Sequence, residues 1–188
     1  MEKNRRKKVL NEVRIFHNLK NRHILKFFNW YETRNHLWII FEYCAGGDLF
    51  QLIEQDRTLP EDTIKRFGRD LSQGLYYLHS NGIVYCDLKP SNVLLNEYST
   101  LKLCDFGLAR KLQDLNPARP KGKNEEDELD EPRAKSGTPY YMAPELFVDE
   151  GVHSFQSDVW ALGCVLYEMA TGKPPFAASG LQELIEQI

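Results

Sequence analysis

The sequence predicts an α+β fold in which a small part with two strands precedes a larger, mainly helical part. Three observations predict this. Residues 23–31 and 36–43 are rich in aromatic and β-branched side chains, which is typical of strands. Residues 61–80 and 155–171 carry apolar side chains at the spacing of long helices. Short apolar runs, separated by polar turns, lie between these two helices and predict short strands.

The composition limits the class of protein. A chain of 188 residues is long enough for one sizeable core or for parts of two lobes. The net charge of −3 gives no electrostatic reason to expect nucleic acid or an anionic membrane as a partner. No apolar run could span a bilayer, and no apolar stretch of a secretory signal follows the basic segment Met1–Lys8. The four cysteines form no C-x-x-C pair, which favours buried thiols in a reducing cytosol. We therefore expect a cytoplasmic protein.

The small part is expected to contain a helix and a hairpin. Apolar residues recur at helical spacing over residues 3–18, and the turn 32–35 joins the two predicted strands. The Gly46–Gly47 pair then interrupts the chain, and Asp48 can cap a helix that continues to about residue 53. A strand, a glycine pair and a helix start together predict a hinge between two lobes.

The large part is expected to be organised by two buried helices. The apolar stripe of helix 61–80 indicates a core-facing side. Helix 155–171 is apolar on most sides, so we expect it to be buried nearly all round. Asp158 lies in its first turn, and the backbone N–H groups of a neighbouring loop are its expected hydrogen-bond donors. Short strands are expected over residues 83–84, 93–95 and 101–103, and a further helix from residue 181.

Residues 111–135 differ from the rest of the chain. Prolines give way to the acidic tract Glu125–Glu131, and the low apolar content and high charge density predict a mobile loop. We favour a solvated insertion over a docking segment, because runs of charge are commonly just solvated.

Four polar residues suit phosphate chemistry. Asp87, Lys89 and Asn92 stand at fixed offsets between apolar runs, and Asp105 precedes a phenylalanine and a glycine. Carboxylate and amide oxygens are ligands that suit Mg²⁺, and a carboxylate suits a hydroxyl group that must lose its proton. The pattern therefore favours a site that holds a phosphate chain, one or two divalent cations and a hydroxyl group.

Three ordered motifs resemble those of eukaryotic protein kinases. Residues 85–92 (YCDLKPSN) resemble the catalytic loop H-R-D-L-x-x-x-N, residues 105–107 are Asp-Phe-Gly, and residues 143–145 are Ala-Pro-Glu. Lys89 and the Thr138–Pro139 pair resemble the serine/threonine branch. In detail the chain is similar to the RUNKEL and fourth unc-51-like kinase group, a microtubule-associated set that includes pseudokinases.

The resemblance implies a bilobal protein-kinase-like fold that is incomplete at both ends. Residues 1–43 would be the remnant of the small lobe, and residues 44–188 the front part of the large lobe, with the flexible acidic insert 111–135. The glycine-rich loop and the lysine-bearing strand of the family have no counterpart in these residues. We therefore expect this chain alone to bind ATP weakly or not at all.

The resemblance also assigns roles around the transferred phosphate. Asp87 would orient the substrate hydroxyl or accept its proton, and Lys89 would neutralise charge on the phosphoryl group. Asn92 and Asp105 would hold Mg²⁺.

The adenine end of ATP is assigned in the same way. Glu42 and Cys44 would present backbone groups to the adenine, Phe41 would guard the back of the pocket, and Leu94 would lie under the ring. Four aromatic residues would stack as a spine between the lobes: Phe16, Phe27, Tyr85 and Phe106.

The implied function is transfer of the ATP γ-phosphate to serine or threonine hydroxyls of a protein substrate. Tyr85 replaces the histidine of the motif, which active kinases tolerate. Cys86 replaces the arginine that pairs with a phosphate on the activation loop, so switching by loop phosphorylation is not expected to work in the usual way. The alternative is a pseudokinase scaffold that keeps the fold. Microtubule-associated proteins are a further expected partner class, with a cytoskeletal location.

Overall fold

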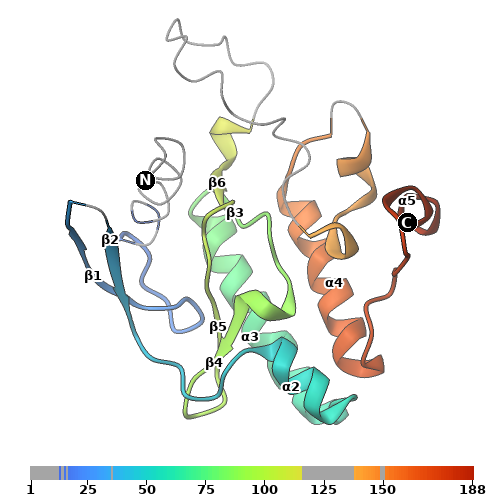
Figure 1. The fold of residues 1–188 in the computed structure, drawn as a ribbon, viewed down its shortest axis with the longest axis horizontal. Helices are drawn as coiled ribbons and strands as arrows, with labels where there is room; N and C mark the ends of the chain where they lie inside the picture. Colours follow the sequence, from blue (N-terminus) through green and yellow to red (C-terminus); the bar gives the residue numbers. More distant parts are fainter. Residues whose placement is uncertain (1–12, 14, 16, 35, 116–137, 149–150) are drawn as a thin grey trace, which may run out of the picture.

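The computed structural model describes residues 13, 15, 17–34, 36–115, 138–148 and 151–188 (Figure 1). The chain order of its helices and strands is β1 (Phe27–Glu32), β2 (Leu37–Phe41), α2 (Leu49–Asp56), α3 (Glu61–Ser80), β3 (Ile83–Val84), β4 (Val93–Leu95), β5 (Leu101–Leu103), β6 (Arg110–Lys111), α4 (Phe155–Thr171) and α5 (Leu181–Gln187). Single 3₁₀ turns are η1 (Pro90–Asn92), η2 (Leu112–Asp114), η4 (Pro139–Tyr141) and η5 (Pro144–Phe147). The two long helices, the three predicted short strands and the helix capped by Asp48 are all present.

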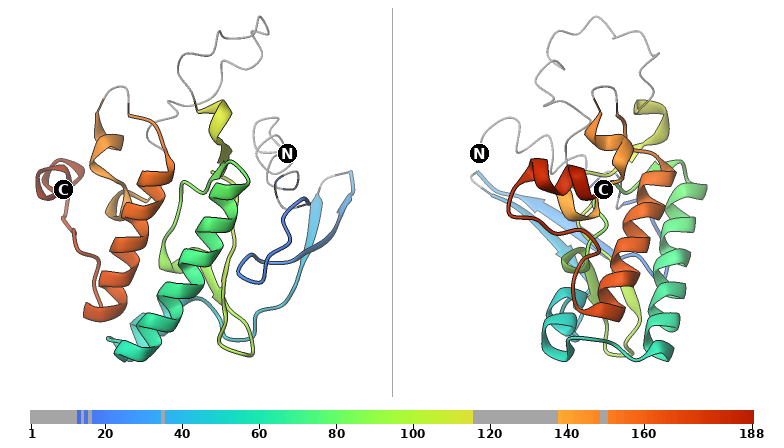
Figure 2. Two further views of the ribbon diagram at one scale, coloured as in Figure 1. Left: turned by 180° about the vertical axis from the view of Figure 1, so that it is seen from behind. Right: turned by 90° about the vertical axis from the view of Figure 1, so that its right-hand side faces the viewer.

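The described strands form three separate antiparallel pairs, β1 with β2, β3 with β6, and β4 with β5. Figure 1 shows the β1–β2 hairpin to one side of the helices and α5 on the opposite side. The two long helices α3 and α4 lie side by side in every view (Figures 1 and 2). The β4–β5 hairpin packs against α3, so the loops at its end lie next to the helical core.

The first strand begins later than the sequence predicts. The sequence predicts residues 23–26 in β1, but residues 23–25 run along β5 instead, where Leu25 N–H donates to the Leu103 carbonyl at 2.9 Å and Leu103 N–H donates to the His23 carbonyl at 2.8 Å. These residues do pair with a strand, but that strand is β5 and not β2. This pairing ties the segment before the hairpin to β5.

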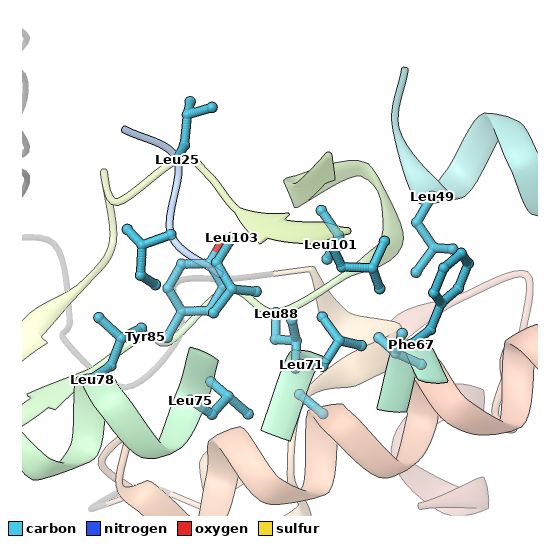
Figure 3. Close-up of a cluster of buried hydrophobic side chains, with 14 of the residues drawn as sticks. Leu25, Leu49, Phe67, Leu71, Leu75, Leu78, Tyr85, Leu88, Leu101 and Leu103 are labelled. Carbon is cyan, nitrogen blue, oxygen red and sulfur yellow. The ribbon is translucent and has the colours of Figure 1, made fainter. Parts of the chain in front are cut away.

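The main core lies between α3 and β5, as Figure 3 shows. The expected stripe on α3 faces this core, and Phe67, Leu71, Leu75 and Leu78 are buried. Leu101 and Leu103 of β5 are 1% exposed and face the same cluster. The amphipathic pattern of α3 therefore positions the β4–β5 hairpin.

Helix α4 is buried on only part of its surface. Ser154 and Ser157 form a reciprocal capping box at its start, and Gly172 ends it in the left-handed conformation. Val159 is 57% exposed and Tyr167 is 49% exposed. The prediction that α4 is buried nearly all round is therefore wrong for the described part of the chain, because α3 and the η4 turn cover only some of its sides.

Five residues of the predicted mobile loop 111–135 belong to the folded structure. Lys111 pairs with Ile83 in the β3–β6 ladder, and Leu115 is buried in a small cluster with Val84 and Cys86. The rest of this predicted loop, residues 116–135, lies outside the described residues. The acidic tract 125–131 lies outside the described residues, as does the helix predicted over 3–18 except for its last part, where Val13 and Ile15 are helical and buried.

None of the described helices combines the length and the apolarity that crossing a membrane requires.

Candidate active site

The loop that carries Asp87 is held by the first turn of α4. Asp158 is buried, and its two carboxylate oxygens accept hydrogen bonds from the backbone N–H groups of Tyr85 at 2.8 Å and Cys86 at 2.9 Å. Nε2 of His79 lies 2.8 Å from one of these oxygens. The prediction that the backbone of a neighbouring loop supplies donors to Asp158 is confirmed.

Two of the predicted site residues, Lys89 and Asn92, converge on the Asp87 carboxylate. Its Oδ2 accepts from Nδ2 of Asn92 at 2.9 Å and lies 2.9 Å from Nζ of Lys89. Its Oδ1 accepts from the Thr138 N–H at 3.3 Å, and Lys89 Nζ also donates to the Thr138 hydroxyl at 2.8 Å. Asp87 is 9% exposed, so its charge is stabilised by these specific donors rather than by bulk water. The result is an oriented carboxylate beside a fixed ammonium group.

The β4–β5 register brings Asn92 and Asp105 to the same end of one hairpin. Val93 pairs with Leu103, and the Cys104 N–H donates to the Asn92 carbonyl at 3.0 Å. Asp105 follows directly, with a φ of 54° that lies in the left-handed region, and its side chain is exposed.

These two residues fit a magnesium site. The Asn92 amide nitrogen bonds Asp87, which leaves its hard Oδ1 oxygen for a cation. One oxygen of the Asp105 carboxylate accepts from the Gly107 N–H, and among the described residues no donor bonds the other oxygen. Mg²⁺ commonly uses one or two such protein ligands and takes the rest from phosphate and water. Within the described residues, no group of three His, Cys, Asp or Glu side chains could hold a metal ion by itself.

The Tyr85 hydroxyl lies between the backbone carbonyl groups of Asn92 and of Cys104, the residue before Asp105. Its hydroxyl donates to the Cys104 carbonyl and lies 3.4 Å from the Asn92 carbonyl. Burial raises the phenol pKa well above its usual value, and nearby Cys104 and carboxylates add to the effect, so the hydroxyl stays a neutral donor. It therefore links the backbone of both residues.

The expected aromatic spine is present in part. The Tyr85 and Phe106 rings meet edge to face, with centroids 5.2 Å apart. Phe27 instead contacts Phe41, with centroids 5.9 Å apart. Phe16 lies outside the described residues.

The segment predicted to meet adenine follows β2. The Glu42 N–H donates to the Lys26 carbonyl at 2.9 Å, which continues the pairing with the segment before β1. Within the described part of the chain, neither the Glu42 carbonyl nor the Cys44 N–H bonds another backbone group. Burial, followed by the Glu42 carboxylate, raises the pKa of the Cys44 thiol. Both predicted backbone groups are thus available to a ligand.

Leu94 lies next to the hinge, and its place under the adenine ring stays a prediction. It bridges to Asp48, and the neighbouring Leu95 exchanges hydrogen bonds of 2.9 Å with the Gly46 N–H and the Gly47 carbonyl. A Cβ on Gly46 would lie 2.7 Å from the Leu95 Cβ, so this close approach requires a glycine.

Two residues at the site were missed by the sequence interpretation. In the sequence, Thr138 indicates only a resemblance to the serine/threonine branch, but in the structure it contacts both Asp87 and Lys89. The sequence places Lys102 only on a strand, but its ammonium group lies 2.9 Å from the Glu42 carboxylate. A lysine between two leucines of a buried strand was a usable signal, because a buried charge needs a partner.

A β hairpin and a helical part, joined by a glycine hinge and carrying this cluster of Asp, Lys and Asn beside an Asp-Phe-Gly turn, are the features of protein kinases. The model of the protein kinase domain matches residues 1–188, and the chain belongs to this family.

Among curated proteins, the chain is 54% identical over 188 residues to the serine/threonine-protein kinase RUNKEL of Arabidopsis thaliana, covering 100% of this chain and 13% of that protein. It is 42% identical over 197 residues to the serine/threonine-protein kinase ULK4 of Mus musculus, covering 100% of this chain and 15% of that protein. It is also 38% identical over 183 residues to the inactive serine/threonine-protein kinase PLK5 of Mus musculus, covering 97% of this chain and 28% of that protein. The chain thus spans a small share of each relative.

Proposed function

We propose that the protein containing this chain is a serine/threonine kinase that transfers the γ-phosphate of ATP to protein hydroxyl groups. The observation that carries this proposal is the convergence of Asn92 and Lys89 on one oxygen of Asp87, each at 2.9 Å. Phosphoryl transfer depends mainly on positioning and charge neutralisation, and this cluster supplies both.

The chemical group of each residue determines its role in the proposed reaction. Asp87 orients the substrate hydroxyl and takes up its proton, since its carboxylate is held by Asn92 and by the Thr138 N–H. Lys89 stabilises negative charge that develops on the transferred group, and its bond to the Thr138 hydroxyl keeps its ammonium group at the site. Mg²⁺, when held by Asn92 and Asp105, neutralises phosphate charge.

A phosphotransfer assay on the full-length protein with ATP, Mg²⁺ and a serine/threonine peptide library tests this function. Asp87→Asn should lower the rate by about 10²-fold or more, because the proton acceptor is lost. Asp62→Asn is the matched control, since the Asp62 side chain is fully exposed at the start of α3. Equal rates in wild type and Asp87→Asn would show that the phosphotransfer does not come from this site.

A pseudokinase scaffold is the second candidate. Two observations favour it: Cys86 stands where the family motif has an arginine, and one similar protein is named as inactive. A scaffold would show no phosphotransfer above the Asp87→Asn background while keeping its fold. Thermal shift with ATP and Mg²⁺ then shows whether nucleotide binding is retained.

The location and the further partners follow from the resemblance and stay predictions. A cytoplasmic protein with microtubule-associated partners should co-sediment with microtubules in extracts. Absence of the full-length protein from the microtubule pellet would contradict this.

A further inference from the structure

Lys102 and Glu42 form an ion pair between β5 and the hinge, and the roles proposed above for the Asp87 cluster do not include this pair. Nζ of Lys102 lies 2.9 Å from Oε1 of Glu42, and the two side chains are only 9% and 22% exposed. The same ammonium group donates to the Arg22 carbonyl at 3.0 Å. A side chain with a charged group so far removed from water needs such acceptors to replace its lost hydration.

The partner carboxylate is fixed from a second side. Oε1 of Glu42 also accepts from the Lys26 N–H at 2.6 Å, while the Glu42 N–H donates to the Lys26 carbonyl at 2.9 Å. Glu42 is therefore held through both its side chain and its backbone. Three segments that are distant in sequence meet at this point: β5, the segment before β1, and the hinge.

The position of the pair relates it to both ends of the nucleotide site. Lys102 lies on β5, three positions before Asp105. Glu42 lies two positions before Cys44, and the Glu42 carbonyl and Cys44 N–H make no backbone hydrogen bond within the described residues. A rigid link between the hinge and β5 fixes the distance between the adenine end and the metal end of a bound nucleotide.

We propose that Lys102 is a positioning residue for nucleotide binding, which through its ion pair with Glu42 holds hinge residues 42–44 at a fixed place relative to the strand that leads to Asp105. The identity of the ligand rests on the proposed function. Lys102 does not touch the nucleotide in this proposal and acts only through Glu42.

The Lys102–Glu42 ion pair is much less exposed than an ion pair on the surface of α3. Lys65 and Glu61 lie 2.8 Å apart on α3, but their side chains are 66% and 81% exposed. Such a pair is screened by water and contributes little. Lys65→Met is therefore the matched control for Lys102→Met.

The experiment uses the full-length protein with the variants Lys102→Met, Glu42→Gln, their double variant and Lys65→Met. Hydrogen exchange of peptides that cover residues 41–46 is measured without nucleotide, and ADP affinity is measured by calorimetry with Mg²⁺. Lys102→Met should speed exchange at the hinge and weaken ADP binding by about tenfold, the usual size of coupling between contacting residues. The double variant should be no weaker than Lys102→Met, because both changes remove the same link.

A purely structural role would lower global stability without this pattern. The KM for ATP should rise in Lys102→Met while kcat per folded protein stays unchanged, and Lys102→Arg should restore ADP affinity because it keeps the charge. If Lys102→Met fails to fold, Glu42→Gln gives the same readouts with a smaller change.

Wild-type values of hinge exchange and ADP affinity in Lys102→Met, or losses that add in the double variant, would overturn the proposal. The failure of the proposed function looks different. A wild type that binds ADP but transfers no phosphate contradicts the kinase activity and leaves the link testable, whereas a wild type that binds no ADP contradicts both.

Discussion

The backbone N–H of Cys86 donates to Oδ1 of Asp158 at 2.9 Å, across 72 positions of the chain. Cys86 has a φ of 70°, which residues other than glycine rarely adopt, and Asp87 follows it directly. The other oxygen of Asp158 accepts from the Tyr85 N–H. The unusual backbone of the loop is therefore stabilised from α4, and the position of Asp87 depends on a residue of that helix.

Replacing Asp158 should destabilise the fold strongly. Asp158→Ala leaves two buried backbone donors and His79 without their acceptor, which should cost about 3 kcal/mol of unfolding free energy. Asp158→Asn keeps one acceptor and should cost less. Urea denaturation measures both, with the exposed Asp62→Ala as a control that stays near the wild-type value. A small effect of Asp158→Ala would mean that the loop holds its shape without α4.

Introducing an arginine at position 86 should be costly in this fold. The Cys86 thiol packs with Val84 and Leu115, and burial together with the Asp158 carboxylate raises its pKa well above 9.0. Cys86→Arg places a charged side chain in this apolar cluster, and it should lower the free energy of unfolding by about 2 kcal/mol. Cys86→Ala removes only the thiol and should lower it by about 1 kcal/mol.

Alkylation provides a second measurement at the same position. The raised pKa keeps the Cys86 thiol neutral, so iodoacetamide at pH 8 should modify it much more slowly in the folded protein than in urea. Rapid modification in the folded state would contradict the apolar setting.

The stability of the protein should respond to Glu168 across the acid range. Burial raises the pKa of Glu168, and the hydrogen bond from Tyr141 at 2.7 Å opposes this only in part. The folded state therefore holds the proton more tightly than the unfolded state, whose pKa is about 4.5. The contribution of Glu168 is full below that pH and is lost as the pH rises through the folded pKa.

Glu168→Gln removes this loss, so the variant should gain stability relative to wild type as the pH rises from about 4 to 7. Thermal unfolding at several pH values checks the slope. Glu186→Gln, on the exposed side of α5, should differ from wild type equally at every pH. A parallel shift in both variants would rule out the buried carboxyl as the cause.

Two glycines separate the effect of backbone conformation from that of a collision. Gly172 has a φ of 78°, and a Cβ there would lie 2.3 Å from the Arg57 carbonyl oxygen. Gly82 has a φ of 68° with nothing within 4 Å. Gly82→Ala should therefore cost about 1 kcal/mol and Gly172→Ala about 3 kcal/mol or more. The melting temperatures of the two variants measure this difference. Equal losses of stability would mean that the backbone at Arg57, at the end of α2, moves away from residue 172 at no cost.

The candidate site could be predicted from the sequence to the extent that it is local. Asp87, Lys89 and Asn92 lie within one short loop, so their spacing alone indicates that they share a site. Asp105 follows the end of β5 by two residues, and the pairing of Val93 with Leu103 places it near Asn92. These residues come together because a short hairpin leaves few possible registers.

The long-range contacts that hold the site in place could not be predicted from the spacing of residues in the sequence. Thr138 and Lys102 are ordinary residues in sequence, and their partners Asp87 and Glu42 are 51 and 60 positions away. A threonine or a lysine has many candidate partners in a chain of this length, and local spacing favours none of them. The same reason explains why residues 23–25, which the sequence predicts in β1, instead run along β5.

The sequence by itself determined the long helices, the short strands and the motif residues, because helical periodicity, glycine turns and apolar runs act between close neighbours. Only the tertiary structure decided that Asp158 fixes the loop of Asp87, that Lys102 reaches Glu42, and that one side of α4 is open among the described residues. These features depend on which buried polar groups find one another when distant segments pack. Burial makes those pairings obligatory, and the packing of the whole chain selects the partners.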